Sequence, residues 1–118
     1  MNNTPNNLNI AFLNCRGQTG FTESKQLQIE NFLLRNNIDI LNLQETHVEN
    51  DSFSTCSAVL NNYEIIKNNN SSEYGTCTLV KNTFEVQDRI LHESGRVIIL
   101  NIGSLSIRNV YLPSGTRN

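Results

Sequence analysis

The chain has 118 residues, a formal net charge of −2 and a pI of about 5.6. This length accommodates one small domain and is too short for two. The slightly acidic balance argues against a free-standing nucleic-acid-binding module, because such modules usually carry a basic face. Hydrophobic residues make up 37% of the chain and charged residues 17%, which is typical of a globular protein.

Asparagine accounts for much of the polar character of the chain. There are 20 asparagines, several of them in short clusters between apolar segments. Asparagine disfavours the interiors of helices and strands and favours turns, so these clusters predict loops. Residues 1–7 are polar and predict a disordered start, followed by a domain over residues 8–118.

The three cysteines, Cys15, Cys56 and Cys77, form no C-x-x-C pair and have no histidine at a metal-binding spacing. This pattern argues against a zinc site. The odd number of cysteines and the lack of a signal-peptide pattern indicate a reducing, intracellular setting, which includes the nucleus. The longest apolar stretch, Val97–Leu100, is far too short to span a membrane.

The first predicted elements are a strand and a helix. Leu8–Leu13 alternates loosely and then becomes apolar, as a strand that enters a buried sheet does. Asn14–Gly17 ends this strand. From Thr22 onward, apolar residues recur at helical spacing, which predicts a helix of about ten to fifteen residues. Asn36–Asn37 is a plausible end for this helix.

A second strand, Ile38–Leu43, leads directly to the sequence Gln44-Glu45-Thr46. The segment 50–61 gives no clear prediction. Beyond it, apolar segments alternate with turn residues, which predicts a series of short strands. These strands are predicted at Tyr63–Lys67, Gly75–Lys81, Phe84–Leu91, Arg96–Ile102 and Leu105–Leu112.

The order of these elements predicts the fold class. A β-α-β opening followed by a run of strands indicates an α/β protein with one mixed, largely antiparallel sheet and one clear helix, rather than a doubly wound fold. A single helix would leave one face of such a sheet uncovered. The turn at 113–118 follows a strongly patterned strand directly, which predicts that the domain is truncated at its carboxyl end.

Polar residues at the carboxyl ends of predicted strands form the candidate site. Asn14 follows the first strand, Glu45 follows the second, and Tyr111 lies near the end of the last. Strand ends commonly line the site in α/β proteins. A carboxylate there suits Mg²⁺, which prefers oxygen ligands, and an amide and a phenol can orient or stabilise a phosphate. Spacing alone also allows Glu45 to be an ordinary solvated carboxylate.

Several segments together resemble the endonuclease/exonuclease/phosphatase superfamily. Within it, the chain is most similar to the apurinic/apyrimidinic-type endonuclease domain of non-LTR retrotransposons. The resemblance covers nearly the whole chain and implies the amino-terminal half of a four-layered DNase I-like α/β sandwich. It is carried by Asn9–Gly17 (NIAFLNCRG), Ile38–Thr46 (IDILNLQET), Tyr74–Lys81 (YGTCTLVK), Gly95–Leu100 (GRVIIL) and Asn109–Gly115 (NVYLPSG).

The resemblance implies a role for each candidate residue. Glu45 matches the glutamate that binds Mg²⁺, for which Mn²⁺ can substitute, and Asn14 matches the asparagine that helps to order the metal site. Tyr111 matches the tyrosine that contacts the scissile phosphate, whereas Gly95-Arg96 matches a signature with a structural role. The family's Asp-His general base, and the Asp and Asn that position the nucleophile and stabilise the transition state, are expected beyond Asn118. Each such group contributes orders of magnitude in rate, so the 118 residues alone are expected to be inactive.

The function implied by the resemblance is that of a Mg²⁺-dependent phosphodiesterase. In the complete domain, this hydrolase would bind the DNA backbone and nick target DNA for a retrotransposon. A repair endonuclease or a phosphatase of the same superfamily is an alternative, and so is a non-catalytic remnant or interaction module. Neither zinc nor a membrane partner is expected.

The histidines and cysteines have simpler interpretations than catalysis. His47 follows the Q-E-T sequence and is expected on the surface rather than as a base, and His92 is expected to be structural or exposed. Cys15 and Cys77 lie in apolar strand contexts and are expected to be buried. Cys56 has no neighbouring base.

Two arginines and one serine are also open to a simple interpretation. Arg16 and Arg96 can bind phosphate through bidentate contacts, although surface arginines without a ligand are commoner. Ser114 lies beside a glycine without the G-x-S-x-G pattern of a nucleophile, and a turn explains it fully.

Overall fold

The structure is a computed structural model, and it describes residues 7–14, 23–44, 58–68 and 75–112. Within these residues the chain forms one α-helix, one short 3-10 helix and seven β-strands. In chain order they are β1 (Ile10–Asn14), α1 (Glu23–Arg35), β2 (Ile40–Gln44), η1 (Leu60–Asn62), β3 (Tyr63–Asn68), β4 (Thr76–Lys81), β5 (Asp88–Leu91), β6 (Val97–Ile102) and β7 (Leu105–Val110).

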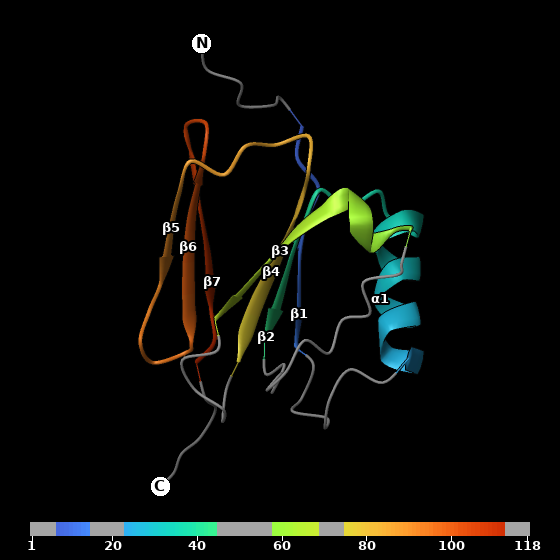
Figure 1. Ribbon diagram of the computed structural model, residues 1–118, viewed down its shortest axis with the longest axis horizontal. Helices are drawn as coiled ribbons and strands as arrows, with labels where there is room; N and C mark the ends of the chain where they lie inside the picture. The colour runs from blue at the N-terminus through green and yellow to red at the C-terminus, as the bar shows by residue number, and fades with distance from the viewer. Residues whose placement is uncertain (1–6, 15–22, 45–57, 69–74, 113–118) are drawn as a thin grey trace, which may run out of the picture.

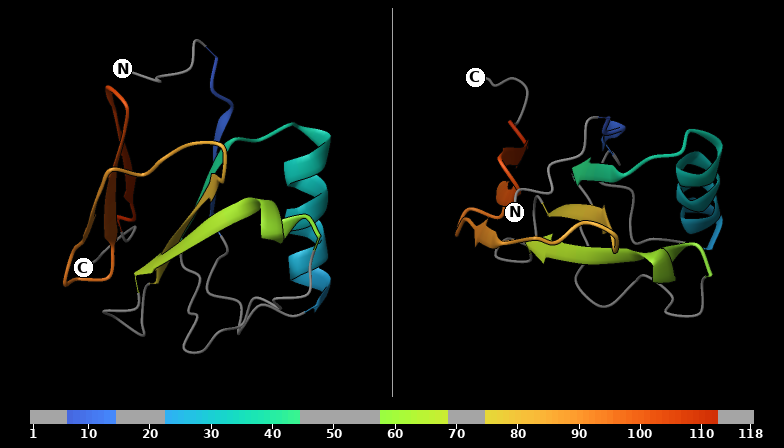
Figure 2. Two further views of the ribbon diagram at one scale, coloured as in Figure 1. Left: turned by 45° about the horizontal axis from the view of Figure 1, so that its top comes forward. Right: turned by 90° about the horizontal axis from the view of Figure 1, so that it is seen from above.

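The strands form two sheets, and the prediction of a single sheet is wrong. The first sheet has the order β1-β2-β4-β3 and the second the order β5-β6-β7. β1 and β2 pair in parallel, and the other neighbours in the two sheets pair antiparallel. The second sheet lies against the face of the first sheet that α1 does not cover, which gives three layers (Figure 1, Figure 2). The face that was expected to be uncovered is therefore covered by strands of this chain.

β2 and β4 lie in the middle of the first sheet and are buried on both faces. Successive side chains of a strand point to opposite faces. In β2, Leu41 and Leu43 therefore pack toward α1, whereas Ile40 packs toward the second sheet. The same alternation holds in β4, where Leu79 packs toward α1 and Val80 toward the second sheet.

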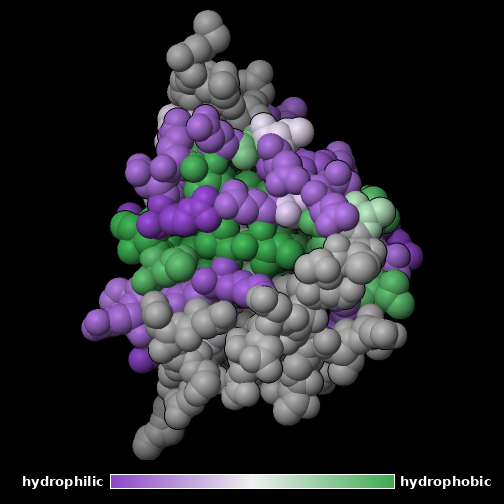
Figure 3. Space-filling model, in the orientation of Figure 1, coloured by the Kyte–Doolittle hydropathy of each residue, from purple (hydrophilic) through white to green (hydrophobic). Residues whose placement is uncertain are grey.

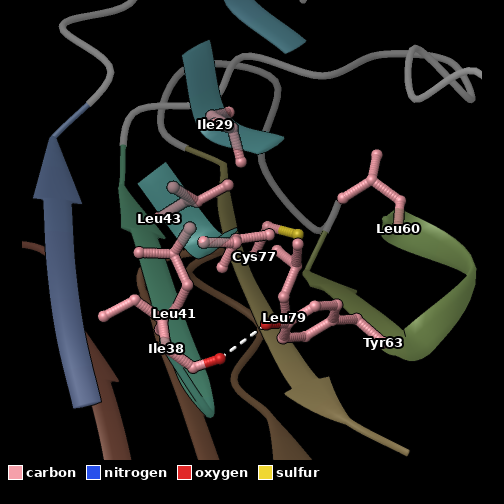
Figure 4. Packing of buried hydrophobic residues seen from close by; sticks show 9 residues of the cluster. Ile29, Ile38, Leu41, Leu43, Leu60, Tyr63, Cys77 and Leu79 are labelled. Atoms are coloured by element: carbon pink, nitrogen blue, oxygen red, sulfur yellow. Dashed lines mark hydrogen bonds between the residues drawn. The ribbon is translucent and has the colours of Figure 1, made fainter. Parts of the chain in front are cut away.

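The helix-side core lies between α1 and the first sheet. α1 contributes Ile29 and Leu33, which are four residues apart and therefore share one face of the helix. The Tyr63 hydroxyl donates a hydrogen bond to the Ile38 carbonyl oxygen, so the phenol is satisfied in apolar surroundings. The other buried members, all labelled in Figure 4, are Ile38, Leu41, Leu43, Leu60, Cys77 and Leu79.

α1 ends where the sequence predicts, at Asn36–Asn37. Asn37 has a φ of 50°, in the left-handed region that asparagine tolerates better than most residues. The Ile38 amide donates to the Leu33 carbonyl oxygen at 3.0 Å, and the Asn36 side chain donates to the Phe32 carbonyl oxygen. These bonds satisfy carbonyl groups that the last turn of a helix leaves unpaired.

The inter-sheet core lies between the two sheets. Its side chains come from β2, β3 and β4 on one side and from β6 and β7 on the other, and most of them are β-branched, as suits strands. Figure 3 shows a band of apolar residues across the middle of the visible face, with polar residues above and below it. The buried members are Ile40, Ile66, Val80, Ile98, Leu100, Ile102 and Ile107.

The connection between the sheets differs from its prediction. A strand was predicted over Phe84–Leu91, but the structure has a strand only at Asp88–Leu91. The Phe84 amide donates to the Lys81 carbonyl oxygen in a turn, and the side chains of Phe84 and Val86 pack against the inter-sheet core. The alternation of apolar residues at 84–87 therefore reflects packing rather than strand pairing.

Candidate active site at the strand ends

Three strands from the two sheets end at the same edge of the molecule. β1 and β2 run parallel, and their last residues, Asn14 and Gln44, are paired in register. β7 ends at Val110, whose carbonyl oxygen accepts a hydrogen bond from the Gln44 side chain at 3.0 Å. The carboxyl ends of β1, β2 and β7 therefore lie together, at the lower edge of the molecule in Figure 1.

The candidate residues predicted from the sequence belong to these strand ends. Asn14 is the last residue of β1 and is exposed. Tyr111 directly follows β7 and is half-buried, and its amide donates to the Arg96 carbonyl oxygen at 2.8 Å, which extends the pairing of β6 and β7. Glu45, which follows β2 in the sequence, lies outside the described residues.

A buried asparagine of the second sheet contacts the first sheet just behind these strand ends. Asn109 of β7 is only 1% exposed. Its Nδ2 group donates to the carbonyl oxygens of Leu43 and Cys77, at 3.2 and 3.1 Å, and contacts Thr78 Oγ1 at 3.2 Å. One side-chain amide of β7 is thereby bound to both β2 and β4.

Two further contacts extend this set of groups into a network. The Thr78 hydroxyl donates to Asn42 Oδ1 at 3.0 Å, and both side chains are buried. Gln44 Nε2 lies 3.4 Å from Asn109 Oδ1. Because the Asn109 NH₂ group faces two carbonyl oxygens, a flipped amide would set its own oxygen against them. We call Asn42, Gln44, Thr78 and Asn109 the inter-sheet network.

The turn between β5 and β6 is held at the same edge. Asn68 Nδ2 donates to the carbonyl oxygens of His92 and Val97, at 2.8 and 3.0 Å, and the Thr76 hydroxyl donates to the Gly95 carbonyl oxygen at 3.0 Å. Gly95 is buried and has a φ of 78°, which a residue with a Cβ atom adopts only at a cost. Gly95 therefore has the structural role expected of it, because it allows the backbone to make this turn.

Two solved structures resemble this arrangement of strands and helix. An AP endonuclease from Archaeoglobus fulgidus superposes with a TM-score of 0.68 at 25% sequence identity, over 90% of this chain and 41% of that chain. Truncated Caenorhabditis elegans TDP2 superposes with a TM-score of 0.56 at 22% identity, over 81% of this chain and 41% of that chain. Both structures are of the endonuclease/exonuclease/phosphatase superfamily, and the described part of this chain has the same fold.

The likeness to this superfamily is one of fold. No protein-family model matches the chain, and no curated protein matches its sequence. The predicted DNase I-like fold, with mixed and largely antiparallel pairing and one helix, is confirmed. The chain spans 41% of the length of each of the two solved structures.

The donor groups at the strand-end edge suit a divalent cation, on which nucleases of this superfamily generally depend. Mg²⁺ keeps several waters and needs only one or two oxygen ligands from the protein. Asn14 is exposed and carries an amide oxygen, and the carboxylate of Glu45 follows Gln44 in the sequence. Within the described ranges, no three His, Cys, Asp or Glu side chains gather into a group that could hold a metal.

Other sequence predictions have mixed outcomes. His92 is exposed and its Nδ1 lies 2.8 Å from Ser94 Oγ, which confirms it as a structural or exposed residue. Cys77 is buried, as expected of a core residue. In the part of the chain that the structure covers, no helix is long and apolar enough to cross a membrane. The predictions for residues 1–6 and for Cys15, Arg16, His47, Cys56 and Ser114 lie outside the described residues.

A cavity of about 210 Å³ lies at the opposite end of the first sheet, between the end of α1, η1 and β4. Asn37, Tyr63 and Lys81 contribute to its lining. Their polar groups are bound within the protein, since Lys81 contacts Asp39 at 3.6 Å and Asn37 Oδ1 at 3.4 Å, and Tyr63 donates to Ile38. We take the strand-end edge as the candidate site, because the carboxyl ends of β1, β2 and β7 meet there.

The sequence prediction gave no role to the inter-sheet network. Gln44 and Asn109 belong to the segments that carry the resemblance, yet neither was assigned a function. The sequence did indicate that Asn109 is buried, because Ile107 and Asn109 lie two residues apart and must face the same side of a strand. A polar residue at a core-facing position of a strand needs a buried partner.

Proposed function

We propose that the chain forms part of a Mg²⁺-dependent phosphodiesterase domain that cleaves one strand of DNA. The proposal is supported by the fold likeness to an AP endonuclease at 25% identity and 90% coverage of this chain. The gathering of the carboxyl ends of β1, β2 and β7 at one edge adds to that support, since these ends carry Asn14 and Tyr111 and lead to Glu45.

In the proposed mechanism each candidate residue has one task. Glu45 and Asn14 hold the metal through their oxygen atoms, and the metal, when bound, supplies positive charge that stabilises the phosphoryl group. The Tyr111 hydroxyl donates a hydrogen bond to a phosphoryl oxygen, where negative charge increases as the bond to the leaving group breaks. None of these three residues deprotonates the attacking water.

The remaining catalytic groups are proposed to lie outside these 118 residues. The Asp-His general base that the resemblance implies has no match in this sequence. We therefore propose that the 118 residues alone do not cleave DNA, and that the complete protein acts inside the cell, including the nucleus. The specific role we favour is the nicking of target DNA for a retrotransposon. A repair endonuclease or a phosphatase would use the same metal site.

The first test is plasmid nicking by the complete protein encoded by the reading frame that contains this chain. With Mg²⁺ present, Glu45→Ala should lower the rate of nicking by about a hundredfold or more, because it removes the carboxylate that holds the metal. His47→Ala is the matched control, two residues away, and should keep most of the activity. Equal losses in the two variants would contradict the assigned roles.

The same assay separates the proposal from its alternative. If the complete protein relaxes no plasmid at any Mg²⁺ or Mn²⁺ concentration, the chain is a non-catalytic remnant or interaction module, and the phosphodiesterase proposal is wrong. If it instead releases phosphate from lipid or nucleotide substrates while it leaves DNA intact, a phosphatase replaces the endonuclease.

A further inference from the structure

We propose that Asn109 is a positioning residue whose buried amide holds the end of β7, and with it Tyr111, against the end of β2. The inference rests on the proposed function, because this alignment matters for catalysis only if Tyr111 and Glu45 act on the same phosphate. Asn109 itself contacts strands of the protein and is not assigned a contact with the substrate.

The burial of Asn109 requires an explanation, because an apolar side chain would suit the interface between two sheets. A buried amide is unfavourable unless it is hydrogen-bonded. Asn109 avoids this cost through its bonds to the carbonyl oxygens of Leu43 and Cys77 and to Thr78. Its neighbour on the same face, Ile107, packs against the inter-sheet core instead.

The bonds of the inter-sheet network are directional, whereas the contacts of the inter-sheet core are not. Apolar burial depends on area and permits small displacements of one sheet over the other. The Asn109 NH₂ group must meet the carbonyl oxygens of two adjacent strands, and this fixes the position of β7 along the strand direction. A buried polar contact of this kind can specify one register of packing.

The fixed position is close to the candidate site. Asn109 precedes Tyr111 by two residues, which is about 7 Å along an extended chain. On the other side, Gln44 is the last residue of β2 and donates to the Val110 carbonyl oxygen. The bonds of Asn109 and of Gln44 thus both hold the end of β7. The residue that follows each of the two strands in the sequence, Tyr111 after β7 and Glu45 after β2, is a candidate residue.

Hydrogen exchange tests the positioning without any metal. In Asn109→Leu, the Tyr111 amide, which is bound to Arg96, should exchange about tenfold or more faster, because the end of β7 loses its anchor. The Gln87 amide, which is bound to Asn101 at the other end of the second sheet, should change much less. A residue that only stabilised the fold would accelerate both amides equally. Equal acceleration, or no change at Tyr111, would overturn the proposal.

Two other variants keep this test decisive. Gln44→Leu removes the bond to Val110 from a half-buried position at the edge, so it should fold even if Asn109→Leu does not, and it should accelerate exchange of the Tyr111 amide in the same way. Arg108→Leu is the matched control, because Arg108 is the exposed neighbour of Asn109 in β7. It should leave the exchange of Tyr111 unchanged.

Paramagnetic broadening by Mn²⁺ links the positioning to the proposed site. In the unaltered chain, Mn²⁺ should broaden the amide signals of Asn14 and Tyr111. In Asn109→Leu, Asn14 should still be broadened and Tyr111 should be broadened less, because only the second sheet has moved. Equal broadening of Tyr111 in both proteins would overturn the proposal. If Asn14 in the unaltered chain is not broadened, the proposed metal site is wrong, and hydrogen exchange alone decides the role of Asn109.

Discussion

The two faces of the first sheet are packed in different ways. Toward α1, β2 and β4 present Leu41, Leu43 and Leu79, and the contact is mainly apolar. Toward the second sheet, the same two strands present Ile40 and Val80 at the end far from the candidate site, and Asn42, Gln44 and Thr78 nearer to it. The difference teaches that apolar burial holds α1 on one face of the sheet, whereas the other face also has directional hydrogen bonds between the two sheets close to the candidate site.

The largest expected effect comes from the apolar face. Leu79→Ala removes a fully buried side chain of the helix-side core and should lower the free energy of unfolding by about 2–5 kcal/mol. The measurement is urea denaturation followed by circular dichroism. Leu34→Ala, at an exposed position of α1, is the control and should change the stability by less than about 0.5 kcal/mol. Similar losses in both variants would mean that α1 does not pack as described.

A smaller effect is expected from the polar edge. Thr78→Val keeps the shape of the side chain but removes the hydroxyl that joins Asn42 to Asn109, and should cost about 1–3 kcal/mol. It should also accelerate exchange of the Tyr111 amide. Thr78→Ser keeps the hydroxyl, so it should leave that exchange rate nearly unchanged even where it lowers global stability. The comparison of the two faces would fail if valine and serine had the same effect on Tyr111.

The smallest effect concerns the polar contact of the helix-side core. Burial raises the pKa of the Tyr63 phenol above its usual value of 10.0, and the nearby carboxylate of Asp39 raises it further. The unfolded chain therefore releases this proton at a lower pH than the folded protein does. The stabilisation is complete below about pH 10 and decreases as the pH rises from there toward the pKa of the folded state.

Tyr63→Phe isolates this contribution. At neutral pH it should cost about 1 kcal/mol, the usual net value of one hydrogen bond. Above about pH 10, the difference in unfolding free energy between the unaltered chain and the variant should shrink. Urea denaturation of both proteins between neutral and alkaline pH measures this difference. A difference that stays constant with pH would show that the Tyr63 hydroxyl is not buried against Ile38.

The elements themselves could be predicted from the sequence because their signals are local. The helical spacing of Ile29 and Leu33 and the asparagines that end α1 are contained in one short segment. The predicted strands likewise overlap the observed ones, although β1 and β7 are shorter than predicted. Each of these patterns depends on residues that are near one another in the chain.

The assignment of strands to two sheets could not be predicted in the same way. β4 pairs with β2 and β3, whereas β6 pairs with β5 and β7. β4 (TCTLVK) is buried on both faces and β6 (VIILNI) only at alternate residues, although β6 has the more continuous apolar sequence. Pairing is a contact between distant segments, and hydrophobic alternation specifies a buried face without specifying the neighbour. Asn109 escaped prediction for a related reason, since asparagine usually indicates a turn and its partners belong to the other sheet.

The inter-sheet network consists of amides and a hydroxyl, and none of its members ionises. Its bonds should therefore hold equally well in acid, in alkali and in concentrated salt, unlike the ion pair of Lys81 with Asp39 at the far end of the same sheet. The proposed binding of a divalent cation and a phosphate at this edge would change the local electrostatic potential there. Anchoring by neutral groups would keep the spacing of Asn14 and Tyr111 insensitive to those changes.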